Sequence, residues 1–336
     1  MKKYNVAIVG ATGAVGHELL KVLAERDFPI NNLVLLASAR SEGKIINWQG
    51  QDYTVHEAKP ESFEGVDIVL FAGGNISKTL APEAVKRGAV CIDNSSTFRY
   101  DPEVPLVVPE VNPEDVRWHK GIIANPNCST IQMVVALKPL YDAFGIKRVV
   151  VATYQAVSGA GKEGLDELQQ QIKDMAAGHE LKIEAFQHQI ACNVIPHIDI
   201  FLDNDYTKEE MKMTWETQKM LHNEDILLSA TAVRVPVYRS HAEAIHIETE
   251  KPVTAEEARA VLAAAPGVVI QDDPAEKLYP MPLYSSDTDE VYVGRIRKDI
   301  AVDNGLSLFV VADQIRKGAA TNAVQIAQLL VAEGLV

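Results

Sequence analysis

The stretch YNVAIVGATGAVGHELLKVLAERDFP, residues 4–29, limits the fold more than any other part of this sequence. It predicts a buried strand, a glycine turn and a helix, with three glycines spaced as GxxGxxG at the turn. Glycines let a backbone turn tightly and approach a pyrophosphate, whose charge the N–H groups at a helix start stabilise. A plain glycine turn is the alternative. The position between the first strand and the first helix favours a dinucleotide site, with contacts expected from Gly10, Thr12, Gly13, Ala14, Val15 and Gly16.

Further apolar strand patterns follow the first helix, at residues 32–40, 66–74 and 89–96. A helix pattern lies between two of them, at residues 77–88. Continuous apolar strands that alternate with helices indicate a parallel sheet covered on both faces. The predicted fold is therefore α/β, of the Rossmann-like, doubly wound class.

The pattern changes after about residue 128. Three later segments alternate in polarity or are rich in β-branched side chains: residues 147–158, 231–240 and 244–250. Such segments are typical of a partly exposed, mixed or antiparallel sheet. Two amphipathic helix patterns accompany them, at residues 165–180 and 208–225. These elements predict a second domain of the α+β class.

The boundary between the two predicted domains lies where this pattern changes. We place the dinucleotide-binding domain at residues 1–127, together with a C-terminal helix within residues 315–336 that is expected to return and pack on it. The second domain takes residues 128–314. A chain of 336 residues is long enough for two domains.

Composition and charge exclude several classes of function. Apolar and charged residues make up 47% and 23% of the chain, as in soluble globular proteins. The net charge of −14 repels polyanions and argues against nucleic acid as a partner. No run of about 18 apolar residues is present, so no membrane span is expected. Glycine-rich turn chemistry follows the first apolar segment where a signal peptide would have a cleavage site, and we expect a cytoplasmic protein.

Three cysteines, Cys91, Cys128 and Cys192, are too few, too far apart and odd in number for a disulfide framework. No CxxC or HExxH spacing occurs, so no metal is expected. A small anionic substrate stays compatible with the acidic chain, provided that arginines or lysines gather locally around it.

The second strand ends in ASARSEGK, which bears on the choice of cofactor. An acidic residue there would hold the ribose 2′-OH of NAD, whereas a basic one accommodates the 2′-phosphate of NADP. Ser38, Arg40 and Ser41 are available, and no carboxylate comes before Glu42. We therefore expect NADP, held in part by these three residues. An ordinary solvated Arg40 fits the spacing equally well.

A literal GxGxxG occurs elsewhere, as GAGKEG at residues 159–164. It also follows a strand pattern and precedes a helix. No second parallel strand with an acidic end follows at the distance that a dinucleotide fold requires. We therefore do not place the main cofactor site there, although this loop is a candidate for a contact with the cofactor.

The segment NPNCSTIQMVVALKPL predicts a helix that begins at Asn127 or Cys128, with Asn127 as a candidate N-cap. Pro126 forces Asn125 into an extended conformation at the entry. A thiol at a helix start is favoured as the reactive thiolate, and the N–H groups there can also hold an oxyanion. On the residues alone, a buried and unreactive Cys128 is the better-supported interpretation, because free cysteines are commonly buried.

Seven motifs, in the same order along the chain, resemble those of aspartate-β-semialdehyde dehydrogenases: GATGAVG, SSTFR, NPNCST, TYQAVSGAG, NVIPHID, RVPVYRSHAEA and RKGAATNAVQIA. The resemblance covers nearly the whole chain, and the short central region resembles the Gram-positive type. It implies an NADP-dependent reduction of 4-aspartyl phosphate to aspartate semialdehyde, in lysine, methionine, threonine and diaminopimelate synthesis. Related acyl-phosphate reductases have different cysteine motifs, similar to SCTTN or HPGCYPT.

The resemblance assigns the chemistry to three residues. It implies that Cys128 attacks the acyl carbon, expels phosphate and forms a thioester, which divides one difficult substitution into two easier ones. His241 is implied as general acid/base, a role that suits imidazole, although a lone histidine in a strand is more often structural. Gln155 is implied to orient the acyl-enzyme by hydrogen bonding.

Arg234 is implied to bind the substrate carboxylate through its planar fork. Arg234 and His241 are seven residues apart, so a straight strand would point them to opposite faces. We predict a bend between them, at Pro236 and Ser240. Arg239 would share the face of His241 in a straight strand and is the rival for this role.

The remaining implied ligands surround the substrate and the nicotinamide. Arg99 and Lys219 are implied to bind phosphate, Glu216 to face the substrate ammonium, and Asn127 to line the substrate site. Glu216 and Lys219 are i,i+3 on a predicted helix and share a face, although a surface ion pair explains that spacing as well.

Ser158, Gly159 and Gln314 are implied to contact the nicotinamide half of NADP. Gln314 stands where the family commonly has asparagine, and it carries the same amide on a longer side chain.

Two other functions share parts of this pattern. A reductase for another acyl phosphate would share the mechanism. A non-catalytic dinucleotide-binding or scaffold relative predicts loss of Cys128, His241 or Arg99, and all three are present. The resemblance also implies a homodimer built on the sheet of the second domain.

Overall fold

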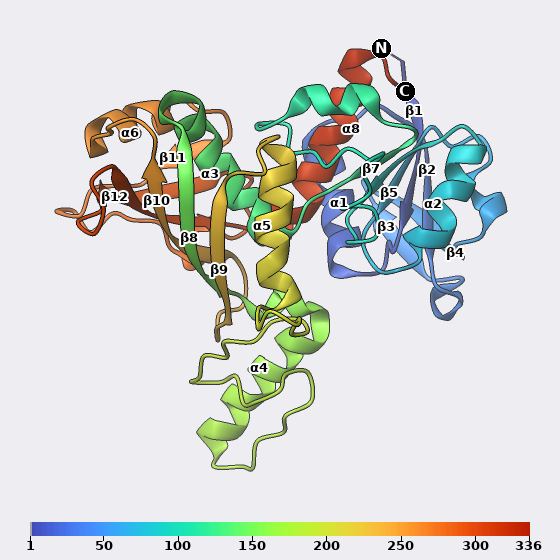
Figure 1. Ribbon diagram of the computed structural model, residues 1–336. Coiled ribbons are helices and arrows are strands. Elements are labelled where there is room, and N and C mark those ends of the chain that lie inside the picture. Colours follow the sequence, from blue (N-terminus) through green and yellow to red (C-terminus); the bar gives the residue numbers. More distant parts are fainter. Residues whose placement is uncertain (1) are drawn as a thin grey trace. The chain divides into compact units, whose positions relative to one another are not determined.

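The computed structural model describes residues 2–336 and divides into two compact units. Unit 1 comprises residues 1–127 and 318–336, and unit 2 comprises residues 128–317. Figure 1 shows each unit as one sheet with helices packed on it. No helix among residues 2–336 is both long and apolar enough to cross a membrane.

Unit 1 contains a seven-stranded sheet in the order β3-β4-β2-β1-β5-β6-β7. Every pairing is parallel except that between β3 and β4. The strands are β1 (Tyr4–Val9), β2 (Ile30–Ala37), β3 (Ile45–Trp48), β4 (Gln51–Glu57), β5 (Ile68–Phe71), β6 (Val90–Asp93) and β7 (Ile122–Ala124). The helices are α1 (Ala14–Glu25), α2 (Ser77–Lys86) and α8 (Thr321–Glu333), with short 3₁₀ turns η1 (Ala39–Ser41), η2 (Pro60–Phe63) and η3 (Pro113–Trp118).

The sheet of unit 1 is covered on both faces, as its apolar strands require. One core joins α1 and α8 to the strands, and a second lies under α2. Within unit 1, α8 packs beside α1, so the C-terminal helix returns to the N-terminal sheet as predicted (Figure 1). The chain ends also meet, since the Lys2 ammonium donates a hydrogen bond to the backbone of Val336.

Unit 2 contains a six-stranded sheet in the order β11-β12-β13-β10-β8-β9. The pairs β8–β9 and β11–β12 are parallel and the other pairs are antiparallel, so the sheet is mixed, as predicted. The strands are β8 (Ile146–Gln155), β9 (Leu227–Arg234), β10 (His241–Thr249), β11 (Val268–Ile270), β12 (Val291–Lys298) and β13 (Gly305–Ala312). The helices are α3 (Cys128–Phe144), α4 (Gly161–Ala177), α5 (Lys208–Met220), α6 (Ala255–Ala263) and α7 (Pro282–Ser285), with the turn η4 (Val157–Ala160).

One face of this sheet packs against α3, α5 and α6. Side chains on β8 alternate accordingly: Val149 and Val151 are buried on that face, whereas Arg148 and Tyr154 are exposed on the other. A short π-helical turn, η5 (Arg316–Ala320), carries the chain from unit 2 back to unit 1.

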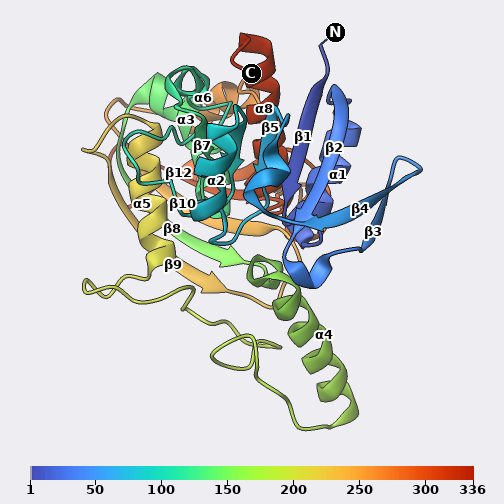
Figure 2. The same ribbon diagram turned by 90° about the vertical axis from the view of Figure 1, so that its right-hand side faces the viewer.

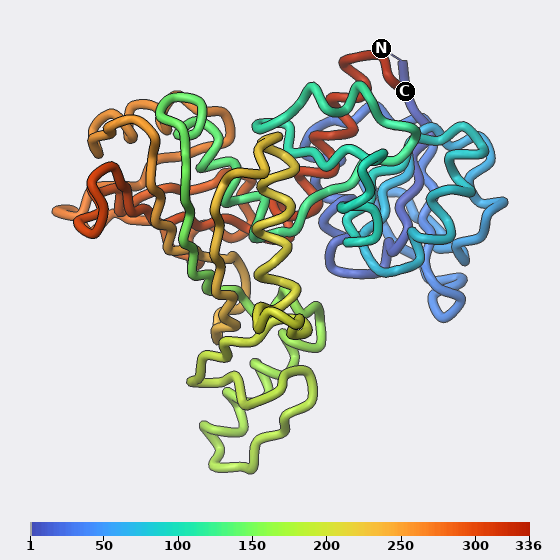
Figure 3. The backbone as a smooth tube through the Cα atoms, viewed as in Figure 1, coloured from blue at the N-terminus to red at the C-terminus, as the bar shows by residue number. Residues whose placement is uncertain are grey.

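Helix α4 and the irregular chain after it form an extension of unit 2, visible in Figures 2 and 3. The helix ends at Gly178, whose φ of 71° is left-handed and which caps the last turn. The next regular element, α5, begins with a capping box between Thr207 and Glu210. Between them the chain is held to α4 by side-chain hydrogen bonds rather than by a ladder.

Candidate functional site

Three of the predicted site residues of unit 2 lie at one end of its sheet. Gln155 ends β8, Arg234 ends β9 and His241 begins β10. In the parallel β8–β9 pair Gln155 is opposite Arg234, and in the antiparallel β10–β8 pair Ala242 is opposite Tyr154. The register therefore places these three side chains side by side, although the first and last are 86 residues apart.

The chain bends between Arg234 and His241, as predicted. β9 ends at Arg234 and β10 begins at His241, with a turn between them in which Ser240 has a φ of 72°. The rival, Arg239, is bound to two acidic residues: its Nε lies 2.6 Å from Asp313 and its Nη1 lies 3.0 Å from Asp287. The straight strand that favoured Arg239 is absent from this segment.

His241 is fully buried, and its hydrogen bonds fix its tautomer. The backbone N–H of Ala156 donates to Nδ1 at 3.0 Å. A backbone N–H can only donate, so Nδ1 accepts and the proton of the neutral ring lies on Nε2. Burial lowers the pKa of His241 to about 3, helped by the Arg234 guanidinium and opposed by Glu209. At neutral pH the ring is therefore uncharged and presents an Nε2–H.

Arg234 is also buried, and its guanidinium is anchored by a 2.7 Å hydrogen bond from Nη1 to the carbonyl of Ala156. Burial lowers the pKa of Arg234, while Glu209 and Cys128 act in the opposite direction. Cys128 therefore lies close enough to Arg234 for their charges to interact.

Gly159 lies outside the dinucleotide turn, and its close neighbours explain why this position is a glycine. A Cβ at this position would lie 2.9 Å from Nη1 of Arg234, and 3.2 and 3.3 Å from Cε1 and Nε2 of His241. Real Cβ atoms essentially never approach within 3.0 Å and rarely within 3.4 Å, so a side chain here would displace Arg234 and crowd His241. The first glycine of the literal GxGxxG therefore leaves room for the side chains of Arg234 and His241 at this sheet end.

Gln314 connects two loops at the same end of the sheet. Its Oε1 accepts a hydrogen bond of 2.7 Å from the backbone N–H of Ser240, and its Nε2 donates to the hydroxyl of Ser158. The longer arm of glutamine is therefore used to join Ser158 to the turn before His241.

Cys128 is the first residue of α3, a helix of 17 residues, and is half-buried. Its position matches the predicted helix start, where N–H groups favour a thiolate. The other cysteines differ: Cys91 is buried, which raises the pKa of its thiol, and Cys192 is exposed on a loop with a φ of 58°. Only Cys128 combines a helix start with partial access.

Glu209 is a site residue that sequence analysis did not identify. It lies in the first turn of α5 and is buried. Its Oε1 accepts from Nε2 of Gln155 at 3.2 Å, and its Oε2 accepts from Nζ of Lys212 at 2.9 Å. Gln155 in turn lies 3.5 Å from Nε2 of His241. Glu209 thus supplies negative charge to the side of the site that Arg234 makes positive.

A signal for Glu209 was present in the spacing along α5. Glu209 and Lys212 precede Glu216 and Lys219 by seven residues, or two helical turns, so the same face carries the acid–base pair twice. Glu216 is fully buried and Lys219 is half-buried. A solvated surface ion pair, the alternative for these two residues, does not fit a buried carboxyl group.

The glycine turn of unit 1 has the geometry of a phosphate cradle. Gly10 has a φ of 90°, Gly13 is the N-cap of α1, and Ala14 and Val15 open the helix. A Cβ on Gly16 would lie 2.3 Å from the carbonyl oxygen of Gly10, so only glycine lets the helix approach the strand this closely. The N–H groups at the start of α1 can therefore face a pyrophosphate.

The end of β2 presents hydroxyl groups and an arginine beside the glycine turn. The hydroxyls of Thr12 and Ser41 lie 3.4 Å apart, which joins the glycine turn to this strand end. Ser38 and Arg40 are exposed beside it. Glu42 is turned away, since its carboxylate accepts from the backbone of Glu57 and lies 3.1 Å from Nδ1 of His56.

Arg99 and Asn127 are buried in unit 1. The Arg99 Nε donates to the carbonyl of Asn125 at 2.9 Å, and its Nη2 donates to the carbonyl of Asn94 at 2.9 Å. Two backbone acceptors thus orient the guanidinium. Asn127 is the residue before Cys128, where unit 1 ends.

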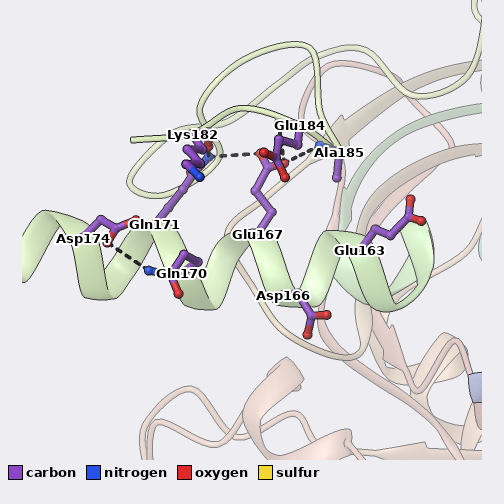
Figure 4. Close-up of a pocket in the computed structure, with 9 residues that line it drawn as sticks. All are labelled: Glu163, Asp166, Glu167, Gln170, Gln171, Asp174, Lys182, Glu184 and Ala185. Carbon is purple, nitrogen blue, oxygen red and sulfur yellow. Dashed lines mark hydrogen bonds between the residues drawn. The ribbon is translucent and has the colours of Figure 1, made fainter. Parts of the chain in front are cut away.

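A separate cavity of about 510 Å³ lies between α4 and the irregular chain that follows it (Figure 4). Acidic side chains dominate its wall, and the carboxylate of Glu167 points across it to the backbone N–H groups of Glu184 and Ala185. None of the predicted site residues lines this cavity. It belongs to the packing of the extension.

Comparisons with known protein families match both units. The semialdehyde dehydrogenase NAD-binding domain matches residues 5–119, and the semialdehyde dehydrogenase dimerisation domain matches residues 137–317. These two matches together span most of the chain.

Curated relatives and solved structures give more specific likenesses. The chain is 61% identical over 99% of both chains to an aspartate-semialdehyde dehydrogenase of Aquifex aeolicus, and 53% identical over 97% of both to that of Bacillus subtilis. A crystal structure of aspartate semialdehyde dehydrogenase II from Vibrio cholerae complexed with ASA has 52% identity and a TM-score of 0.96, covering 98% of this chain and 99% of that one. A structure with NADP from Candida albicans has 28% identity and a TM-score of 0.78, covering all of both chains.

Proposed function

Because the chain belongs to the aspartate-semialdehyde dehydrogenase family, we propose that it reduces 4-aspartyl phosphate with NADPH through a thioester on Cys128. The observation that carries this proposal is the meeting of Arg234, Gln155 and His241 at one sheet end, with Arg234 close enough to Cys128 for their charges to interact. That set combines a nucleophile, a cation and a proton donor.

In the first step the Cys128 thiolate attacks the acyl carbon. The new C–S bond forms as the bond to the phosphate oxygen breaks, and inorganic phosphate leaves. The start of α3 and the positive charge of Arg234 favour the thiolate before attack, and the same N–H groups stabilise the developing oxyanion. Bound NADPH supplies the hydride that reduces the acyl carbon.

In the second step His241, the proposed acid/base residue, acts through its Nε2–H. When the thioester carbon is reduced, the Nε2–H donates a hydrogen bond to the oxyanion of the thiohemiacetal on Cys128, because a neutral ring that gave up this proton would become an imidazolate. As the C–S bond breaks, the oxyanion becomes the aldehyde oxygen and the thiolate leaves, so no net proton transfer is required. The hydrogen bond from Ala156 to Nδ1 supports this role, because it keeps the proton on the nitrogen nearest the site.

The substrate's charges have matching groups among the proposed ligands. Arg234 binds the α-carboxylate, Glu216 faces the ammonium, and Arg99 and Lys219 bind the phosphate, with Asn127 lining the site. Gln155 holds the acyl group in place, itself oriented by Thr153 and Glu209. These arginines and lysines provide the local positive charge that an acidic chain otherwise lacks.

The cofactor proposal is NADP. Its pyrophosphate lies on Gly10, Thr12, Gly13, Ala14, Val15 and Gly16, and its 2′-phosphate on Ser38, Arg40 and Ser41. Ser158, Gly159 and Gln314 line the nicotinamide side. The diversion of the Glu42 carboxylate supports NADP over NAD, because no acidic group is left to bind the ribose 2′-OH.

Unit 1 is proposed as the NADP-binding domain and unit 2 as the catalytic and dimerisation domain. We further propose a homodimer in which the outer face of the β8–β10 sheet is covered by a second copy. Tyr154 and Phe309 on that face are in ring contact at 6.2 Å. We do not extend the proposal to a Gram-positive subtype, because relatives of comparable identity come from Aquifex, Legionella, Campylobacter and Bacillus.

The assay runs the reaction backwards with aspartate semialdehyde, NADP and phosphate, and follows NADPH absorbance. Absorbance that depends on all three additions supports the proposal. A protein that binds NADP but produces no NADPH would reject it. Competition with the semialdehydes of other acyl-phosphate reductases separates this enzyme from its nearest rivals, since the proposed substrate should give the highest kcat/KM.

A further inference from the structure

Glu243 is a fully buried carboxyl group that the proposed chemistry does not use. It lies on β10 two residues after His241, so both side chains point to the same face of the sheet. It is opposite Thr153 on β8 and Val310 on β13, and neither supplies a positive charge. Within residues 2–336, neither oxygen of Glu243 has a hydrogen-bond partner.

Gln132 is the polar neighbour of Glu243. It lies on α3 four residues after Cys128, one helical turn along the same face. Its Nε2 donates to the backbone carbonyl of His241 at 3.3 Å. A carbonyl can only accept, so this contact fixes the orientation of the Gln132 amide: Nε2 faces the His241 carbonyl and Oε1 points away from it. Within the part of the chain that the structure describes, that buried oxygen has no partner.

The two unpartnered groups complement each other only if Glu243 carries a proton. An ionised carboxylate accepts but cannot donate, so it would leave Oε1 of Gln132 unmatched. A neutral carboxylic acid donates one hydrogen bond, which that oxygen can accept. Burial without a cation strongly disfavours the charged form and raises the pKa of Glu243 well above its ordinary value. A hydrogen bond donated by Gln132 would lower this pKa, but Nε2 of Gln132 is bonded to the carbonyl of His241 instead.

We propose that Glu243 is a positioning residue, held as a neutral carboxylic acid that donates a hydrogen bond to Gln132 and thereby locks Gln132 onto the backbone of His241. The chain of contacts runs from the helix that begins with Cys128, through Gln132, to the strand that begins with His241. It sets the distance between nucleophile and proton donor from behind the site. The expected effect on kcat rests on the proposed function, whereas the hydrogen bond between Glu243 and Gln132 rests on the buried contacts alone.

The kinetic test compares Glu243→Gln with Glu243→Leu. A glutamine N–H can donate to Gln132 as the acid does, so Glu243→Gln should keep kcat within about twofold. Leucine leaves Oε1 of Gln132 unmatched and frees the amide, so kcat should fall about 10- to 100-fold with KM unchanged. Glu256→Leu, the same substitution at an exposed site on α6, is the matched control and should change neither.

Two results would overturn the proposal: Glu243→Gln as impaired as Glu243→Leu, or Glu243→Leu with a normal kcat. Coupling gives a further arm. In a Gln132→Leu background, Glu243→Leu should cost nothing more, because the contact it supports is already gone. Independent, multiplicative losses would contradict the chain of contacts.

A spectroscopic arm keeps the proposal testable if Glu243→Leu does not fold, or if the wild-type protein lacks the proposed activity. Infrared spectra of the wild type at neutral pH should contain the carbonyl stretch of a protonated carboxylic acid, and Glu243→Gln should lose it. A wild-type spectrum without that band would refute the neutral acid whatever the enzyme turns over. Absence of semialdehyde activity with the band present would reject the proposed function alone.

Discussion

The two units build their sites in opposite ways. In unit 1 the phosphate cradle is a continuous run from Gly10 to Gly16, and the close approach of Gly16 to the Gly10 carbonyl explains its spacing. In unit 2 the proposed acid/base site is assembled from the ends of β8, β9 and β10, which the chain reaches at Gln155, Arg234 and His241. The first kind of site depends on local backbone shape. The second depends on the register of a sheet.

This difference predicts different responses to substitution. A change in the cradle should affect one proposed binding contact at a time, because these contacts come from single residues along one short segment. A change at the strand ends should affect several groups together, because the backbone of a single residue, Ala156, is hydrogen-bonded to both Arg234 and His241.

The largest effect is expected at Cys128. Cys128→Ala should lower kcat by at least about a thousandfold, since the covalent step is removed. NADP binding to unit 1, measured by calorimetry, should be unchanged. Cys192→Ala, on an exposed loop, is the matched control and should behave as wild type. Equal activity of Cys128→Ala and Cys192→Ala would contradict the account of unit 2.

Gly159→Ala should reveal the crowding at the strand ends. The added methyl would lie 2.9 Å from Arg234, which must shift, and 3.2 Å from His241, which must give by a few tenths of an ångström. Such a displacement should lower kcat by more than about tenfold, short of the roughly hundredfold cost of a misplacement of about 1 Å. Steady-state kinetics at saturating NADP measures the loss. An unchanged kcat would mean that Arg234 and His241 are free to shift without consequence.

Much of the fold and part of the site followed from the sequence. The doubly wound sheet, the mixed sheet and the return of the last helix were predicted because apolar periodicity is a local signal. The bend before His241 was predicted because Pro236 and Ser240 mark it. Glu209 was missed, since its contact with Gln155 requires knowing where α5 packs. The tautomer of His241 required the position of a backbone N–H on another strand.

Acid should destabilise unit 2 through His241. Its folded pKa of about 3 lies below the ordinary value of 6.5, so the unfolded chain binds the proton first as pH falls. Stability from this residue is complete above pH 6.5 and is lost progressively toward pH 3, by about 2 kcal/mol between pH 7 and pH 5. His241→Gln should remove this part of the slope in urea unfolding measured at both pH values. Parallel slopes for wild type and variant would contradict a buried neutral ring.

The smallest effect is expected at the edge of the cradle. Arg40→Glu should raise the KM for NADP about tenfold and leave that for NAD nearly unchanged, because one exposed charge contact to the 2′-phosphate is lost. Lys44→Glu makes the same charge change a few residues away, at another exposed side chain, and should have little effect. If both variants raise the KM for NADP equally, the overall charge of this region selects the cofactor and not a contact with Arg40.

The central claim is that Cys128 carries the acyl group during turnover. Incubation of His241→Gln with aspartyl phosphate, without a nicotinamide, followed by intact-mass and peptide mass spectrometry, tests it most directly. The account predicts an aspartyl adduct on the peptide that contains Cys128, reversible by hydroxylamine, and none on the peptides of Cys91 or Cys192. An unmodified Cys128 in protein that has consumed the aspartyl phosphate would contradict it.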